Sequence, residues 1–229
     1  GCFQEENSKE KTQIIEKISF VDSINYELRK YPTTTHLIYE IIKGSEENFR
    51  DTNKLEKIIE NVEKQYKKKE NYSKEEVIKI LKTINKEIEN LGLKFEKNKF
   101  DCDDLSFIYL AVGEKFNSNL YVISAPEHFF IRYDQDGKHN ALNPNDSINK
   151  GDFNWETIYG KIYSDEDYKK LLSISKKSIE NYVYLKNLTK QELIAQAYSN
   201  IGVAFYSKGE EEEDLAIKDY NKSIELNPN

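Results

Sequence analysis

The sequence contains no methionine, only two cysteines, and no long hydrophobic run among its 229 residues. Because no apolar stretch approaches the roughly 18 residues of a membrane span, the sequence excludes a transmembrane helix. It also lacks a cluster of basic residues. Lysine and glutamate are interspersed, and the net charge of −7 argues against a nucleic-acid partner. Three scattered histidines and one available cysteine give no metal-ligand spacing, so we expect no metal and no other cofactor.

The first ten residues are polar after an initial Gly1-Cys2. They resemble what remains when a bacterial lipoprotein signal peptide is trimmed near its cleavage site. The resemblance implies that Cys2 carries a lipid anchor, that residues 1–10 form a tether, and that the protein is extracytoplasmic, touching the membrane only through this lipid. Cys102 would then be a free thiol. The alternative is that Gly1-Cys2 is a cloning remnant.

Cys102 lies at the start of a predicted helix. Asp101 can serve as the N-cap, and apolar residues follow at helical spacing, namely Leu105, Ile108, Tyr109 and Val112. The unpaired amides and the positive dipole end of a helix N-terminus favour a reactive thiolate. The carboxylates of Asp101, Asp103 and Asp104 oppose this effect, so a cationic histidine partner would be needed. The alternative is a buried structural cysteine.

Asp136-Gly137 separates two alternating runs, which predicts a β-hairpin with a two-residue turn. In that register Arg132 pairs with Ala141, and His128 and Asn143 are diagonal neighbours roughly 5–8 Å apart. One strand face then carries His128, Phe130 and Arg132. The opposite, buried face carries Phe129, Ile131, Tyr133 and Leu142. A histidine is thus expected beside an amide that can hold its ring in one tautomer.

The helix-borne cysteine, the strand-borne histidine, the Asp-Gly turn and the A-L-N-P segment at 141–144 resemble the core of the transglutaminase-like superfamily, distant relatives of papain-type cysteine proteases. The resemblance implies an α+β, cysteine-proteinase-like fold with a nucleophile helix on a small antiparallel sheet. It also implies that Cys102 is the nucleophile, His128 the base and Asn143 the orienting residue. In that superfamily the third position is usually aspartate, whereas this sequence has asparagine.

Helical segments are expected on both sides of this core. Apolar periodicity predicts four helices between about residues 12 and 90, the last opened by a capping box at Ser73 and Glu76. A loop containing Trp155, more consistent with packing than with the site, is expected at 144–160, and a helix at 165–183. The C-terminal residues that resemble a tetratricopeptide repeat are Tyr198, Gly202, Phe205, Ala216, Tyr220, Ser223 and Pro228. The expected domains are a transglutaminase-like domain with a helical cap at 11–160 and a helical segment with one repeat at 161–229.

The resemblance implies a thiol amide hydrolase or acyltransferase acting on a peptide or protein substrate. The alternative is a non-catalytic binding protein with an inactive triad, in which the repeat contacts a protein partner. The repeat could also act as a buttress that stacks on the 165–183 helix, because a single repeat cannot cover its own inner face.

Overall fold

A computed structural model describes residues 20–43, 51–96, 100–139 and 152–228, and the chain divides into two compact units. One unit combines residues 1–42 with 190–229, and the other spans residues 43–189. The predicted domains had assigned residues 11–42 to the transglutaminase-like domain and 161–189 to the C-terminal helical segment that contains the repeat. No helix in the described part of the chain is long and apolar enough to cross a membrane.

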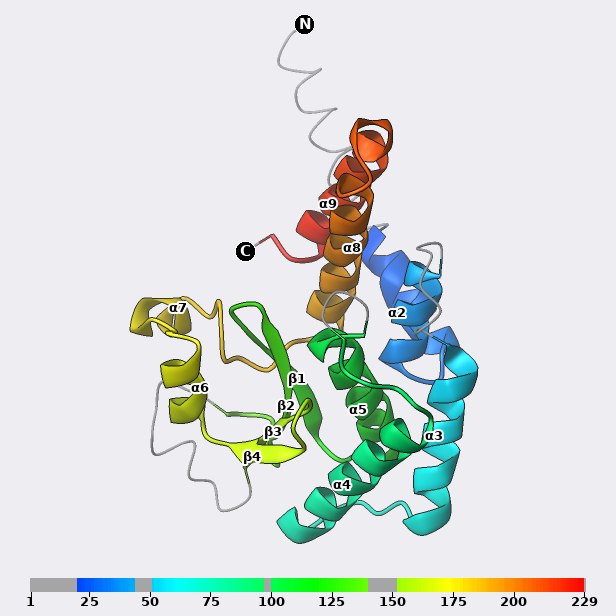
Figure 1. The fold of residues 1–229 in the computed structure, drawn as a ribbon, viewed down its shortest axis with the longest axis vertical. Helices are drawn as coiled ribbons and strands as arrows, with labels where there is room; N and C mark the ends of the chain where they lie inside the picture. The colour runs from blue at the N-terminus through cyan, green and yellow to red at the C-terminus, as the bar shows by residue number, and fades with distance from the viewer. Residues whose placement is uncertain (1–19, 44–50, 97–99, 140–151, 229) are drawn as a thin grey trace, which may run out of the picture. The chain divides into compact units, whose positions relative to one another are not determined.

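The first unit is helical. It contains helical residues 20–30, α2 (Thr34–Ile42), α8 (Lys190–Tyr206), the short 3-10 helix η2 (Glu210–Glu212) and α9 (Glu213–Leu226). Helix α8 packs against α9 and α2 (Figure 1). A Cβ at Gly202 would lie 2.8 Å from the Tyr220 ring, and Ala216 is buried. The predicted close approach of the helices at Gly202 and Ala216 is therefore confirmed.

Three helices of the second unit lie where the sequence predicts them. Helix α3 covers Thr52–Gln65, α4 covers Lys74–Asn90 and α5 covers Cys102–Phe116. The capping box at Ser73 and Glu76 is present. The apolar stripes of α3 and α4 are fully buried and include Leu55, Ile58, Ile59, Val62, Val77, Ile80, Leu81 and Ile84. Both helices contact α5, so the helix that begins with Cys102 is held in a helical layer.

The sheet of this unit is antiparallel and has the order β1-β2-β3-β4. Its strands are β1 (Leu120–Ala125), β2 (His128–Tyr133), β3 (Phe153–Glu156) and β4 (Lys161–Tyr163). Helix α5 packs against β1 and β2, with Phe107 and Phe129 in edge-to-face ring contact. The unit is thus α+β with a small antiparallel sheet, as predicted.

The predicted Asp136-Gly137 hairpin is wrong. β2 pairs with β1 along one edge and with β3 along the other, so Arg132 lies opposite Tyr121 and Asn154 rather than Ala141. A turn forms one residue earlier than predicted, since the Gly137 N–H bonds to the Asp134 carbonyl at 3.2 Å, with Gln135 and Asp136 between them. The Asp134 carboxylate then accepts the backbone N–H groups of Lys138 and His139, and the second edge of β2 pairs with β3 instead. The expected loop at 144–160 contains β3 instead, and Trp155 is buried in it, as expected for packing.

Two short helices cover the sheet face opposite α5. The predicted 165–183 helix is wrong, because the chain forms α6 (Asp165–Leu171) and α7 (Lys176–Glu180), separated by Ser173 at a φ of 52°. They share an apolar cluster with the sheet, formed by Ile123, Ala125, Phe130, Tyr168, Ile174, Ile179 and Leu185. This packing places residues 161–189 with the sheet rather than with the repeat.

Candidate functional site

Cys102 is the first residue of α5, and Asp101 caps the helix by accepting the Asp103 N–H, as predicted. The residue is 9% exposed. Its thiol donates to the Asp103 carboxylate at 3.6 Å, and the backbone N–H of Phe129 is directed at the sulfur. Cys102 therefore lies beside the backbone that immediately follows His128.

The environment of the Cys102 thiol favours its neutral form. Burial and the carboxylate of Asp103 raise the pKa of Cys102 to about 12, against the lowering effect of the Phe129 N–H. The sequence had suggested that the helix N-terminus and an imidazolium could outweigh the aspartates. The structure reverses that expectation, because desolvation and the nearest carboxylates dominate.

His128 begins β2 and contacts a buried carboxylate. Its Nε2 lies 2.7 Å from Oε2 of Glu156 on β3, and the two side chains are 14% and 4% exposed. The partner on the adjacent strand holds the ring in one orientation, beside the rings of Phe130 and Tyr168. Since Nε2 is engaged, Nδ1 is the nitrogen left to exchange a proton with another group.

Glu156 is itself held by two further donors. The Tyr168 hydroxyl donates to Oε2 at 3.0 Å, and the Ile158 N–H donates to Oε1 at 3.0 Å. The Tyr168 ring stacks on Phe130 with a centroid separation of 3.8 Å. Burial and the Glu156 charge raise the pKa of Tyr168, so its hydroxyl remains a donor. The pair of His128 and Glu156 is therefore fixed by α6 as well as by the sheet.

The predicted triad is only partly within the described residues. Asn143 and the proposed anchor Cys2 lie outside them, so their roles stay predictions. Within the described part, no hydrogen bond joins the Cys102 thiol to the His128 ring. The structure brings the sulfur next to the Phe129 backbone and brings His128 to Glu156.

The sequence interpretation missed Glu156 and Tyr168. The F-N-W-E segment at 153–156 has few residues, and its alternation was hidden inside a stretch interpreted as loop. The lone Trp155 was the available signal, because a buried tryptophan flanked by polar residues is typical of a strand with one covered face.

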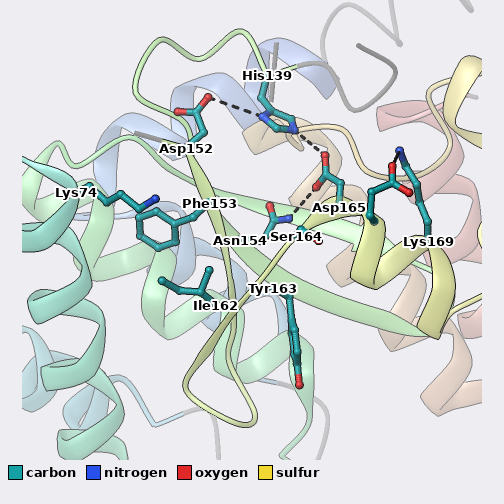
Figure 2. A pocket seen from close by; sticks show the side chains of 11 residues that line it. Lys74, His139, Asp152, Phe153, Asn154, Ile162, Tyr163, Ser164, Asp165 and Lys169 are labelled. Carbon is teal, nitrogen blue, oxygen red and sulfur yellow. Dashed lines mark hydrogen bonds and ion pairs between the residues drawn. The ribbon is translucent and has the colours of Figure 1, made fainter. Parts of the chain in front are cut away.

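A pocket with a volume of about 250 Å³ opens beside β3 and α6 (Figure 2). Its lining includes Lys74 on α4, the ring of Phe153 on β3, and Tyr163 on β4. His139 and Asp152 complete one wall. This pocket is formed mainly by residues that the sequence interpretation did not assign to any site.

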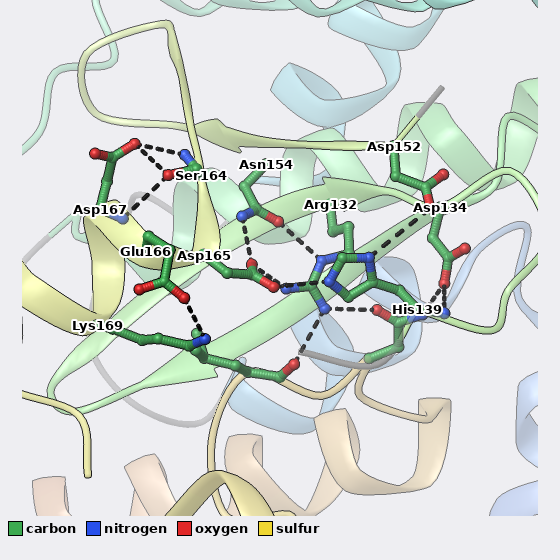
Figure 3. Close-up of polar contacts among 12 residues, drawn as sticks. Arg132, Asp134, His139, Asp152, Asn154, Ser164, Asp165, Glu166, Asp167 and Lys169 are labelled. Atoms are coloured by element: carbon green, nitrogen blue, oxygen red, sulfur yellow. Dashed lines mark hydrogen bonds and ion pairs between the residues drawn. The ribbon is translucent and has the colours of Figure 1, made fainter. Parts of the chain in front are cut away.

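Next to the pocket, a buried polar cluster surrounds Arg132 on β2 (Figure 3). Its guanidinium donates to Asp165 at 2.7 Å, Asn154 at 2.8 Å, the Leu185 carbonyl at 3.1 Å and Asn187 at 3.3 Å. Burial alone would raise the pKa of Asp165, but the hydrogen bond from His139 and the charge of Arg132 hold it well below its usual range. The face of β2 that the sequence predicted to carry the site is therefore covered by α6 at Arg132.

Metal-ligating groups gather at one place in the described residues. Ligand atoms of Asp101, Cys102 and Asp103 lie within 4.8 Å of one another. Both carboxylates are already used there, one as the helix cap and one as acceptor of the thiol.

No protein-family model, curated protein or solved structure matches this chain.

Proposed function

We propose that the protein is a thiol-dependent amide hydrolase or acyltransferase that acts on peptide or protein substrates. Cys102 is the nucleophile, and His128 is the general base. The observation that supports this most is the 2.7 Å contact between His128 Nε2 and the buried Glu156 carboxylate, one residue from the Phe129 N–H that meets the Cys102 sulfur. In this proposal Glu156 orients the base, and the orienting role predicted for Asn143 stays a prediction.

The raised pKa of Cys102 assigns a resting state in which the thiol is protonated. The His128 ring packs beside Phe130 and Tyr168 on the sheet face covered by α6, whereas Cys102 begins α5 on the opposite face. Activation in this proposal therefore requires the thiol to leave the Asp103 carboxylate and the His128 ring to turn at the start of β2, so that Nδ1 meets the sulfur. The buried Glu156 carboxylate stabilises the imidazolium that forms when the ring takes the proton. The proton transfer thus accompanies substrate attack rather than preceding it.

The reaction proceeds through a thioester. As His128 takes the thiol proton, the sulfur bonds to the amide carbonyl carbon, and the oxygen becomes an oxyanion. The C–N bond then breaks, and the imidazolium gives its proton to the leaving amine. Water or a second amine, deprotonated by His128, attacks the thioester and releases the Cys102 thiol. Water completes hydrolysis and an amine completes acyl transfer.

A second candidate function is a non-catalytic binding protein. It is favoured by the Cys102–Asp103 contact and by the lack of a thiol–imidazole hydrogen bond in the described residues. In this proposal the α8–α9 pair contacts a protein partner and the His128–Glu156 pair only stabilises the sheet. The two functions differ in whether Cys102 forms a covalent intermediate.

A peptide-library assay tests the proposal. The purified chain is incubated with a mixture of peptides, with and without glycine ethyl ester as amine acceptor, and mass spectrometry detects new termini or amine adducts. Cys102→Ala should abolish product, and His128→Gln should lower the rate by about a hundredfold or more, the usual contribution of a general base. Glu156→Gln should give a smaller loss, because it removes charge but keeps a hydrogen-bonding side chain.

Matched controls exist in the chain. His36 is a buried histidine bonded to Thr33 in the helical unit, and Glu87 is a buried glutamate bonded to Asn61. His36→Gln and Glu87→Gln should leave the rate within about twofold, since neither residue contacts the site. Product formation that persists in Cys102→Ala, or no product from the wild type, would overturn the enzyme proposal in favour of the binding protein.

A further inference from the structure

Strand β4 forms an outer edge of the sheet and pairs with β3 on one side only. In the part of the chain that the structure describes, no other segment bonds to the outward-facing backbone of Lys161–Tyr163. The edge at β1 is closed instead, because the N–H groups of Leu185 and Leu188 bond to its carbonyl groups at 3.0 Å. The described sheet therefore keeps backbone donors and acceptors available along β4.

The pocket beside β3 and α6 lies at the end of this edge. Ile162 and Tyr163 of β4 line it, together with Ser164, which follows the strand. Pairing between β3 and β4 stops at Asn154, so the preceding Phe153 has no partner on β4, and its ring lines the pocket (Figure 2). A further strand added to β4 would therefore pass the pocket, and one of its side chains could enter.

The size and the apolar wall of the pocket suit a side chain of medium length. Its volume of about 250 Å³ is several times the roughly 30 Å³ share of one water molecule in the liquid. Phe153 and Ile162 supply the apolar wall, and Ile162 is 45% exposed. Methylene groups that cover these two residues would remove apolar surface from water.

The charges that line the pocket favour an acidic side chain. Each of the three lining carboxylates contacts a basic residue, namely Asp152 with His139, Asp165 with Arg132, and Glu166 with Lys169. Lys74, the first residue of α4, lines the pocket with its Nζ 5.5 Å from the centre of the Phe153 ring. Within the described residues this ammonium contacts no carboxylate, so its N–H groups can donate to one that enters.

We propose that the edge of β4 docks an extended segment of another protein, with a glutamate side chain in the pocket. The segment extends the sheet by pairing with Lys161–Tyr163. Its glutamate accepts hydrogen bonds from Lys74 and packs its stem on Phe153 and Ile162. Pairing to a strand of three residues is weak by itself, so the pocket supplies much of the affinity and the sequence preference. The site is separate from the Cys102 chemistry and does not require the protein to be an enzyme.

Titration of the ¹⁵N-labelled full chain with an acetylated and amidated peptide of sequence TVTETVT tests the site by NMR at constant ionic strength. Saturable shifts are expected for the amides of Lys161–Tyr163, and the outward-facing amides of β4 should exchange more slowly with solvent. The same peptide with glutamine at its centre should bind about threefold to fivefold more weakly, as expected for the loss of one partly exposed ion pair.

Methylation of the peptide backbone distinguishes strand pairing from simple charge attraction. Successive residues of a strand direct their N–H groups to opposite sides. One peptide is N-methylated at its second and fourth residues, and another at its third and fifth. The set that faces β4 should lose about tenfold or more in affinity, because hydrogen bonds are removed, whereas the other set should stay within about twofold. Equal effects of the two sets would overturn the pairing.

Lys74→Gln tests the pocket and should lower the affinity for the glutamate peptide to that for the glutamine peptide. Lys82→Gln is the matched control, since Lys82 is an exposed lysine of the same helix that does not line the pocket. It should leave both affinities within about twofold. Circular dichroism verifies folding, and if Lys74→Gln is unfolded, the two peptides compared on the wild type decide. No saturable binding, equal wild-type affinities for the two peptides, or a glutamate preference that persists in folded Lys74→Gln would each overturn the proposal.

Discussion

Asp165 and Tyr168 lie three residues apart on α6 and hold two different polar groups of the sheet. The Asp165 carboxylate bonds Arg132 at 2.7 Å, and the Tyr168 hydroxyl bonds Glu156 at 3.0 Å. Residues three apart share one side of a helix, so α6 contacts both groups with a single face. A change in α6 should therefore affect the buried Arg132 cluster and the His128–Glu156 pair together.

Tyr168→Phe should remove the hydrogen bond to Glu156 while the ring keeps its stack on Phe130. Because Glu156 retains two other donors, the expected loss in the free energy of unfolding is about 1 kcal/mol, measured by urea denaturation. The His128 ring resonances should also shift in NMR spectra. Tyr163→Phe is the control, since Tyr163 contacts the Tyr168 ring edge-on. This substitution should leave the His128 resonances in place.

Asp165→Asn should be strongly destabilising, because it leaves the buried Arg132 guanidinium without its compensating charge. Breaking one side of a buried ion pair typically costs about 3–5 kcal/mol. Urea denaturation at pH 7 measures the loss in the free energy of unfolding. Glu166→Gln, on the exposed side of α6, is the control, and its free energy of unfolding should lie within about 0.5 kcal/mol of the wild-type value. A cost below about 1 kcal/mol would contradict the role assigned to the cluster.

The loss of unfolding free energy caused by Asp165→Asn should depend on pH in a defined direction. The pKa of Asp165 is lowered in the folded state, so its contribution is present above the unfolded pKa of about 3.9 and is lost as the pH falls toward the folded value. The gap in unfolding free energy between wild type and Asp165→Asn should stay constant from pH 7 to pH 5. It should then narrow progressively below about pH 4. A gap that widens on acidification would contradict this assignment.

Local patterns predicted much of the second unit. The Asp101 cap, the Ser73 capping box and the stripes of α3 and α4 depend on residues a few positions apart, and each is present. The shared face of His128, Phe130 and Arg132 is also present, because alternation is a property of the strand itself. Phe130 and Arg132 are both covered by α6.

Strand pairing could not be predicted, because it depends on long-range competition. The Asp-Gly signal predicted that the chain after Gly137 returns along β2, but the Asp134 carboxylate captures the backbone of Lys138 and His139. The edge of β2 is taken instead by β3, which brings Glu156 to His128. Hydrogen bonds from two backbone amides to one side chain leave no periodic pattern in the sequence. The pairing of Glu156 with His128 could therefore not be predicted.

The raised pKa of Cys102 predicts slow alkylation at neutral pH. In a Cys2→Ala background, the rate with iodoacetamide should increase about tenfold per pH unit between pH 7 and pH 9, because thiolate is the reactive form and its fraction is still small there. Asp103→Asn removes the nearest carboxylate and should increase the rate at pH 8 severalfold. Asp22→Asn, an exposed aspartate in the helical unit, should not change it. A rate that is already constant by pH 7 would contradict a neutral resting thiol.

Gly202→Ala tests the close approach of α8 and α9. Alanine is normally favoured over glycine inside a helix by about 1 kcal/mol, so a variant without a steric conflict would be stabilised. At Gly202 the added methyl would meet carbon atoms of the Tyr220 ring at 2.8 and 2.9 Å, closer than van der Waals contact allows. We therefore expect a loss of about 1–3 kcal/mol in the free energy of unfolding, as for overpacked cores.

The companion substitution separates a steric conflict from a loss of local structure. Tyr220→Leu removes the ring atoms that the new methyl would meet, so in the Tyr220→Leu background Gly202→Ala should cost little or should stabilise the protein. Urea denaturation of the four proteins gives the coupling energy of the double-mutant cycle, expected to exceed about 1 kcal/mol for residues in contact. Additive effects would show that Gly202 and Tyr220 do not meet, and that the α8–α9 pair packs through other residues.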